Sequence, residues 1–284
     1  MKSQEEKRIR AEVRQRYGSI AKQELPNCSC QPSSSRGTES TTSIRWTDRL
    51  TEPTNVPEGS DLGLGSGDTI ALARLKPGEK VLDIGSGGGV DCFRAAKLVG
   101  SDGFVIGVDM TPEMVYKARR HAAEEKYPNV EFRLSEIEHL PVTGNSIDVI
   151  ISNCVINLSA EKDKVFNDAY RVLKPGGRLA ISDVVATKPL PDDVKADLSL
   201  VASCIAGAAT IDEMHQFLKD AGFQQIDIQP IEQSRELFRE MACGLGLESY
   251  LISADIEAIK PGDLSEERTR GSGYVPNEFS TPFL

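Results

Sequence analysis

From Asp68 onward, short apolar runs alternate with longer stretches in which apolar residues recur at helical spacing. The short runs are rich in Val and Ile, which favours buried parallel strands, and the stretches between them favour helices that cover a sheet. We predict strands over residues 80–84, 104–109, 130–134, 147–152, 178–183 and 225–229, and helices over 89–98, 112–125, 161–173 and 211–221. This alternation predicts the α/β class, with a Rossmann-like and mostly parallel sheet.

Local signals refine the ends of these elements. Thr111-Pro112-Glu113 provides an N-cap, a proline at the first helical position and an acid in the first turn. Residues 174–177, Lys-Pro-Gly-Gly, end the preceding helix and turn the chain into the next strand. Strict alternation of apolar and polar residues over 249–260 predicts a seventh and last strand, which we expect to be antiparallel.

The N-terminal part of the chain differs from this pattern. Residues 4–20 are charged with apolar positions at helical spacing, which predicts a helix that loosens or ends near Gly18. Residues 31–43 are rich in Ser and Thr and nearly devoid of apolar side chains, which predicts a mobile loop. We therefore expect an N-terminal helix and flexible cysteine-bearing segment over 1–67, the main domain over 68–260, and a disordered tail over 261–284.

Composition and charge exclude several classes of function. The chain has 284 residues, of which 39% are hydrophobic and 27% charged, and this is ordinary for a globular protein. It contains no apolar stretch approaching 18 residues and no apolar run near its start, so we expect a soluble, cytoplasmic protein without a membrane partner. The net charge of −10 disfavours nucleic acid as a partner, because phosphate binding needs a positive surface. The six cysteines are too few and too scattered for a disulfide scaffold, and we expect free thiols.

A glycine-rich turn follows the first predicted strand of the main domain. In residues 81–89, Val-Leu-Asp-Ile-Gly-Ser-Gly-Gly-Gly, a backbone without Cβ atoms can approach a ligand closely. Val90 stands where the dinucleotide fingerprint needs its third glycine, which disfavours a pyrophosphate. Asp109 lies 24 residues after Gly85, close to the spacing at which an acid reaches ribose hydroxyls. A ribose without pyrophosphate fits S-adenosylmethionine, and the alternative is a tight turn that binds no ligand.

This combination resembles the class I methyltransferases, whose Asp-x-Gly-x-Gly signature is present from Asp83 to Gly87. The resemblance implies that Asp109 holds the ribose hydroxyls, that Met110 packs on the adenine and that Asp83 orients the glycine loop. For Met110 the alternative is plain core packing, and for Asp83 it is bracing of the loop. The cofactor contacts implied in this way are Asp83, Gly85, Ser86, Gly87, Asp109, Met110, Glu136, Ile137 and Asn153.

Two cysteines follow predicted strands of the sheet. Cys154 comes directly after the fourth strand, and Cys204 comes after the fifth. Because ligands of open α/β sheets bind at the carboxyl edge, the two thiols are expected to converge there. Cys28 and Cys30 precede the predicted mobile loop, so either could fold over the same place. For any one of these cysteines, the alternative is a buried and inert thiol.

Several short segments of the sequence resemble the arsenite methyltransferase family. They are Arg16-Tyr17-Gly18, residues 62–65, Asp91-Cys92-Phe93, residues 108–114, residues 151–158 and residues 204–208. The resemblance implies that Cys154, Cys204 and one of Cys28 or Cys30 bind trivalent arsenic as thiolates. It also implies a cofactor contact from Tyr17, S-adenosylmethionine as methyl donor, and a thiol reductant, glutathione or thioredoxin, as co-substrate.

The chain departs from the family's pattern at two places. The family's usual Leu-Gly-Cys-Gly reads Leu64-Gly65-Ser66-Gly67, and Cys28-Ser29-Cys30 replaces an adjacent cysteine pair. Two other functions compete with arsenic methylation. A methyltransferase of a small organic metabolite would need a base, for which His121, His139 and His215 are weak candidates. A metal- or metalloid-binding module would join Cys28, Cys30, Cys154 and Cys204 in a closed zinc site, but their spacing is unlike that of compact zinc modules.

Overall fold

The computed structural model describes residues 2–22, 56–201, 204–241 and 246–262. The strands are β1 Lys80–Ile84, β2 Phe104–Asp109, β3 Val130–Leu134, β4 Ile147–Asn153, β5 Leu173–Ala186, β6 Gln224–Ile231 and β7 Leu251–Ile259. The α-helices are α1 Lys2–Lys22, α2 Thr69–Ala73, α3 Val90–Val99, α4 Pro112–Glu124, α5 Lys162–Val172, α6 Asp192–Lys195, α7 Leu198–Val201, α8 Ile211–Asp220 and α9 Ser234–Met241. Short 3-10 helices cover η2 Ile156–Leu158 and η3 Leu247–Ser249.

Within the described residues, seven strands form one sheet in the order β3-β2-β1-β4-β5-β7-β6. The pairs β1–β2, β2–β3, β1–β4 and β4–β5 are parallel, and β7 runs antiparallel to both β5 and β6. The predicted mostly parallel sheet with an antiparallel last strand is therefore confirmed. The strand order reverses between β1 and β4, and in open α/β sheets ligands bind in the crevice beyond the carboxyl ends at such a point.

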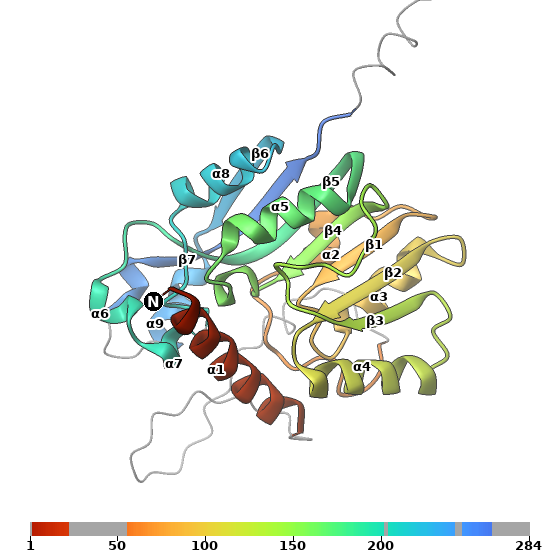
Figure 1. Cartoon of the computed structure of the whole chain (residues 1–284), viewed down its shortest axis with the longest axis horizontal. Coiled ribbons are helices and arrows are strands. Elements are labelled where there is room, and N and C mark those ends of the chain that lie inside the picture. Colours follow the sequence, from red (N-terminus) through yellow and green to blue (C-terminus); the bar gives the residue numbers. More distant parts are fainter. Residues whose placement is uncertain (1, 23–55, 202–203, 242–245, 263–284) are drawn as a thin grey trace, which may run out of the picture.

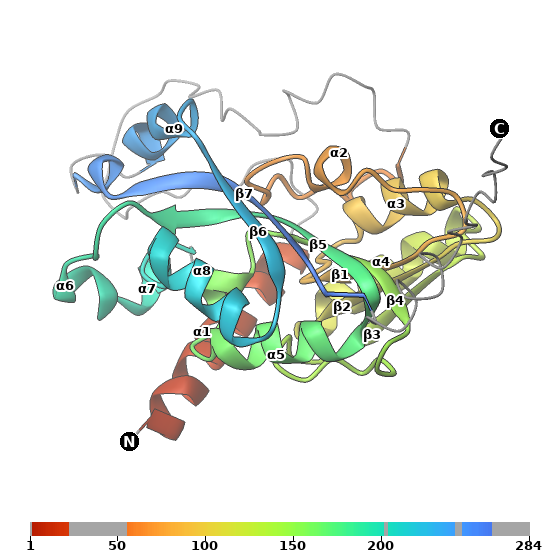
Figure 2. The same cartoon turned by 90° about the horizontal axis from the view of Figure 1, so that it is seen from above.

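Helices cover both faces of the sheet, and the alternation of side chains along each strand explains why (Figures 1 and 2). Val81 of β1 packs with residues of α2, α3 and α4, whereas the next residue, Leu82, packs with residues of α5 and α8 on the opposite face. Both side chains are fully buried. A strand that is buried on both faces has apolar residues at consecutive positions, and this is the pattern from which the strand was predicted.

Helix α1 lies outside these two layers and contacts α4, α7 and η2 (Figure 1). The prediction that this helix ends near Gly18 is wrong, because α1 continues to Lys22. Gly18 is buried, and a Cβ at this position would lie 3.2 Å from Glu113 Oε2 of α4. The glycine therefore serves close packing between two helices instead of a helix end.

The other boundaries agree closely with the predictions, with one difference at β5. Helix α5 ends at Val172, as the Lys-Pro-Gly-Gly signal predicts, but residues 174–177 belong to the strand itself, with a register shift against β4 between Ile147 and Val149. The predicted loop over 31–43 and nearly all of the predicted tail lie outside the described residues. No helix in the described part of the chain is long and apolar enough to cross a membrane.

We predict that Leu82→Ala lowers the free energy of unfolding by about 2–5 kcal/mol, because it removes a fully buried side chain and leaves a cavity in the central strand. Leu98→Ala is the matched control, because Leu98 is 48% exposed on α3 and its truncation should change stability by about 0.5 kcal/mol or less. Urea unfolding followed by circular dichroism measures both. Equal losses in the two variants would contradict this account of the core.

Candidate active site

A cavity opens at the carboxyl ends of β1, β2 and β4, where the strand order reverses. It encloses about 1260 Å³ of empty space, part of it open to solvent, which is ample for a small organic molecule. Its walls come from the glycine loop after β1, the ends of β2 and β4, the segment over 60–67, and the inner face of α1. The site therefore gathers residues that are far apart in the sequence.

The glycine loop forms the floor of this cavity. Gly85 and Gly87 have φ angles of 77° and 51°, in the left-handed region that favours glycine. A Cβ at Gly85 would lie 2.4 Å from Val155 Cγ2, so the loop also needs glycine for space. The Ser86 hydroxyl lines the cavity and is buried without a hydrogen-bond partner among the described residues, as is that of Ser60. Buried hydroxyls are rarely left unpaired, so a ligand with polar groups fits here.

The predicted ribose-binding acid, Asp109, lies beside this loop. One carboxylate oxygen accepts the Gly87 amide at 3.0 Å, and the other accepts the Thr111 amide at 2.8 Å. Burial raises the pKa of Asp109, and these two backbone donors oppose that shift. A carboxylate can accept about four hydrogen bonds, so the group keeps acceptor capacity for a hydroxyl from the cavity.

Acidic side chains dominate the end of the cavity near β1. Asp83 and Asp91 both line it, and the Cys92 thiol donates to Asp83 Oδ2 at 3.2 Å. Burial, and then the neighbouring Asp91 carboxylate, raises the pKa of Asp83 well above its usual range. A cationic group placed here would relieve this cost, because an opposite charge favours the ionised form. Arg94 pairs with Asp91 at 3.1 Å.

Apolar residues also line the cavity. Met110 and Ile137 line the cavity together with Met114 and Leu158, and the adenine contacts that the resemblance implies for the first two stay a prediction. Glu136, which was expected beside Ile137, is not among the lining residues, and its carboxylate accepts a hydrogen bond from Arg14 of α1 at 2.8 Å. The side chain of Glu136 faces α1, and its contact with the adenine, which the resemblance implies, stays a prediction.

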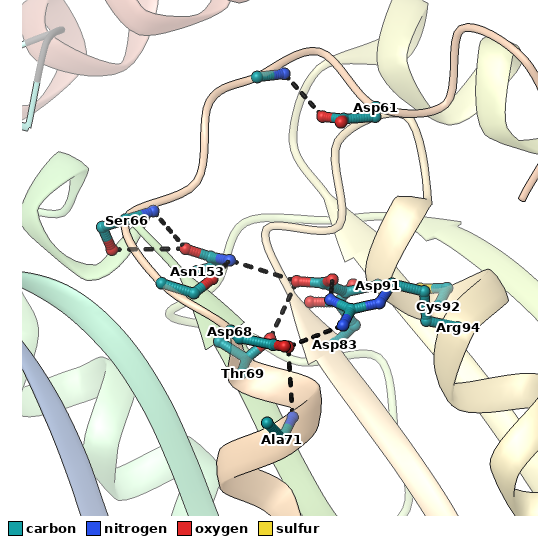
Figure 3. Close-up of polar contacts among 12 residues, drawn as sticks. Asp61, Ser66, Asp68, Thr69, Ala71, Asp83, Asp91, Cys92, Arg94 and Asn153 are labelled. Carbon is teal, nitrogen blue, oxygen red and sulfur yellow. Dashed lines mark hydrogen bonds and ion pairs between the residues drawn. The ribbon is translucent and has the colours of Figure 1, made fainter. Parts of the chain in front are cut away.

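Asn153, at the end of β4, connects the cavity to the segment over 60–67 (Figure 3). Its side-chain oxygen accepts the Ser66 amide at 2.7 Å, and its Nδ2 donates to Gly67 O at 2.9 Å. The same Nδ2 lies 3.3 Å from Asp91 Oδ2, which also accepts the Thr69 hydroxyl at 2.9 Å. Asn153 therefore lines the cavity, as expected, and also clamps the neighbouring segment over the sheet.

Cys154 and Cys204 lie together beside the cavity. The Cys204 thiol donates to Cys154 O at 3.0 Å, and Cys154 is itself a lining residue. The hydrogen bond to Cys204, together with burial, raises the pKa of the Cys154 thiol well above its usual range. Both cysteines have left-handed φ angles, 56° and 62°, which are uncommon for residues with a Cβ and occur at functional sites. Cys28 and Cys30 lie outside the described residues.

Tyr17 of α1 joins the thiols to the cavity. Its side chain lines the cavity and forms a hydrogen bond to Cys204, and burial followed by the two nearby cysteines raises its pKa well above the usual range. Tyr17, Cys154 and Cys204 share one apolar cluster with Val13 and Met110. The residue predicted to contact the cofactor thus also contacts a candidate substrate ligand.

Two charged residues near the thiols were missed by the sequence analysis. Asp183 of β5 is fully buried and accepts the Ile156 amide at 2.9 Å and the Asn157 side-chain amide at 2.9 Å. Burial raises its pKa to about 6. Burial lowers the pKa of Lys162, and the charges of Asp183 and Cys204 oppose this shift by raising it. An acid inside an otherwise apolar strand was the signal that could have found Asp183.

Comparisons with known proteins agree with this geometry. A family model described as a methyltransferase domain matches residues 75–222. The chain belongs to this methyltransferase family. The arsenite methyltransferase of Halobacterium salinarum is 55% identical over 207 residues, which cover 73% of this chain and 53% of that protein. The predicted resemblance to arsenite methyltransferases is thereby confirmed, and this methyltransferase spans about half the length of the curated relatives it matches.

Solved structures show the same fold. An arsenic(III) S-adenosylmethionine methyltransferase from Chlamydomonas reinhardtii matches with a TM-score of 0.56 and 34% identity, over 66% of this chain and 65% of that chain. Phosphoethanolamine N-methyltransferase 2 of Haemonchus contortus, in complex with S-adenosyl-L-methionine, matches with a TM-score of 0.58 and 21% identity, over 69% of this chain and 53% of that chain. At that identity the likeness concerns the fold alone.

We predict that Cys204→Ala shifts the pH profile of Cys154 alkylation to lower pH, because the hydrogen bond to Cys204 is the first cause of the raised pKa of Cys154. At pH 8 the rate with iodoacetamide should rise about fivefold, the equivalent of one neutral hydrogen bond. Mass spectrometry of the Cys154 peptide measures the rate. Better access alone would raise the rate equally at every pH, and an unshifted midpoint would contradict the prediction.

Proposed function

We propose that this methyltransferase transfers methyl groups from S-adenosylmethionine to trivalent arsenic held by the thiolates of Cys154, Cys204 and one of Cys28 or Cys30. The observation that carries the proposal is the contact between Cys154 and Cys204 at the wall of the cofactor-sized cavity. A methyltransferase of a hydroxyl or amine substrate has no use for two adjoining thiols there. The identity to arsenite methyltransferases over 73% of the chain supports the same substrate.

The cavity fits S-adenosylmethionine at each of its ends. When bound, this cofactor supplies an electrophilic methyl group on a positively charged sulfonium. Asp83 and Asp91 favour the cationic amino-acid end, and Asp109 has free acceptor positions for the ribose hydroxyls. Met110 and Ile137 offer an apolar surface to the adenine. The Ser86 hydroxyl, which has no partner among the described residues, is available for a hydrogen bond to the cofactor, and Gly85 lets the backbone of the loop approach it closely.

The thiols suit arsenic as a substrate. Trivalent arsenic is soft and prefers thiolate sulfur, and three such ligands leave it a lone pair that acts as the nucleophile. Each thiol that replaces a hydroxide of arsenite gives up its proton, and the hydroxide leaves as water. Transfer then needs positioning and exclusion of water more than a general base. The buried position of Cys204 and the apolar cluster around both thiols provide such surroundings.

The reaction also needs a source of reduced thiols. Transfer of the methyl group to the lone pair takes arsenic formally from As(III) to As(V), and two cysteine thiolates supply the two electrons that return it to As(III) as they form a disulfide. We propose that glutathione or thioredoxin reduces this disulfide, and that the enzyme works in the cytoplasm, where thiols stay reduced. A closed zinc site is the competing use of the same cysteines. Among the described residues, no group of three His, Cys, Asp or Glu side chains is arranged to hold a metal ion. Metal analysis of the purified full chain distinguishes the two uses.

We predict that Cys154→Ser abolishes methylation of arsenite and leaves S-adenosylmethionine binding within about twofold of wild type. Serine removes one soft ligand and keeps the shape of the side chain. Methylated arsenic is measured by chromatography with elemental mass spectrometry after incubation with arsenite, cofactor and a thiol reductant, and cofactor binding by calorimetry. Full activity in the variant would refute the role of Cys154, and an inactive wild type that binds the cofactor would point to an organic substrate.

We predict that Asp109→Asn weakens S-adenosylmethionine binding by about tenfold to a hundredfold, because hydrogen bonds to a charged acceptor contribute roughly 1.5–3 kcal/mol. Asp163→Asn is the matched control, since Asp163 is exposed on α5 and is not among the residues that line the cavity. Calorimetric titration with the cofactor measures both. Unchanged affinity in Asp109→Asn would exclude Asp109 as the ribose contact.

A further inference from the structure

Arg94 brings a positive charge to the acidic end of the cavity. It lies on α3, three residues after Asp91, so the two side chains project from the same side of the helix. Its guanidinium donates to Asp91 Oδ1 at 3.1 Å and to Asp68 Oδ1 at 2.8 Å (Figure 3). The side chain is 16% exposed and lines the cavity. A guanidinium has five N–H donors, so Arg94 keeps donors for a further acceptor.

Arg94 is the cation that contacts the acids of this end. Among the described residues, the cavity lining contains one other positively charged side chain, Arg10 of α1. Arg10 pairs with three glutamate carboxylates, those of Glu136, Glu138 and Glu161. Its charge therefore serves the contact between α1 and the sheet, whereas the charge of Arg94 lies beside Asp91 at the end near β1.

The position of Asp91 does not depend on Arg94 alone. Asp91 Oδ2 accepts the Thr69 hydroxyl at 2.9 Å and lies 3.3 Å from Asn153 Nδ2 (Figure 3). A buried carboxylate needs such donors, and these two remain if Arg94 turns toward a ligand. Arg94 can therefore share its guanidinium between Asp91 and an anionic group in the cavity.

A ligand with an ammonium and a carboxylate on one carbon needs both kinds of charge at this end. Asp83 and Asp91 line the cavity there and favour the ammonium. The carboxylate is attached to the same carbon, so it must lie close to the same two acids, where like charges repel each other. A guanidinium beside them offsets this repulsion, and its planar fork of donors matches a carboxylate in geometry.

We propose that Arg94 binds the carboxylate of the methionine part of S-adenosylmethionine and thereby selects a cofactor with an intact amino-acid end. The inference deepens the proposed function, and it rests on the cofactor and not on the arsenic substrate. Without Arg94, the carboxylates of Asp68, Asp83 and Asp91 would favour a decarboxylated analogue, because that molecule keeps both positive charges and lacks the negative one. Arg94 reverses this preference.

The test compares S-adenosylmethionine with decarboxylated S-adenosylmethionine, which lacks only the carboxylate. Calorimetric titration of the full chain measures both affinities. We expect the wild type to bind S-adenosylmethionine about tenfold to a hundredfold more tightly than the analogue, the range for hydrogen bonds to a charged group. Arg94→Met keeps an apolar stem and removes the guanidinium. It should weaken S-adenosylmethionine binding by about the same factor and bind the analogue at least as tightly as the wild type does.

Two further variants separate ligand binding from a structural role. Arg119→Met removes a part-buried guanidinium that donates to Phe132 O at 2.7 Å and does not line the cavity, and it should keep the wild-type ratio of the two affinities. Arg94→Lys should recover part of the preference for S-adenosylmethionine, because lysine keeps the charge without the fork of donors.

The ratio of the two affinities decides the inference. A wild-type ratio in Arg94→Met overturns it, whether both affinities persist or both fall, and so does a wild type that binds the two ligands equally. A wild type that binds neither ligand contradicts the proposed cofactor itself. Loss of arsenite methylation with the expected ratios would leave the role of Arg94 standing and contradict only the proposed substrate.

Discussion

The position of the candidate thiols depends on the parallel register between β4 and β5. Asn153 pairs with Ser182 in this register, and the ladder continues for one more hydrogen bond, from the Cys154 amide to Ser182 O. The next residue of β5, Asp183, then accepts the amide of Ile156 and fixes the turn that follows. A slip by one residue would move every side chain of β4 to the other face of the sheet. The cysteine would leave the cavity with them.

The site carries costs that the rest of the fold must offset. Cys154 and Cys204 adopt left-handed backbone conformations, which cost energy for residues with a Cβ. Asp83 and Asp183 place carboxylates in buried positions, and burial disfavours their charged forms. The large apolar clusters on both faces of the sheet supply the compensating stability. Left-handed backbone conformations and buried carboxylates are concentrated where ligands are expected, which is typical of functional sites.

Much of the fold could be predicted because its signals are local. The strands from β1 to β4 are apolar runs between turn residues, and Thr111-Pro112 marks the start of α4 by its chemistry alone. Gly18 was misread because a glycine that ends a helix and a glycine that admits a neighbouring helix look the same in one sequence. The pairing partner in α4, Glu113, is 95 residues away, and no local pattern connects the two.

The site could be predicted only in part for the same reason. The glycine loop and Asp109 belong to one βαβ unit, and their spacing is fixed by the chain between them. The contacts of Tyr17 with Cys204, and of Ser66 with Asn153 and Ser182, join segments that meet only in the folded sheet. Glu136 and Ile137 show that neighbours in the sequence can face different surroundings, since Ile137 lines the cavity while the Glu136 carboxylate pairs with Arg14 of α1.

Helix α1 contacts both the cofactor cavity and the pair of thiols. Tyr17 hydrogen-bonds to Cys204, whereas Arg10, two turns earlier on the same helix, lines the cavity and pairs with Glu138 and Glu161. The Glu138 carboxylate is 6% exposed, so the ion pair is screened less by salt than a surface pair would be. Helix α1 therefore covers the cofactor cavity and packs against the thiol pair with one element.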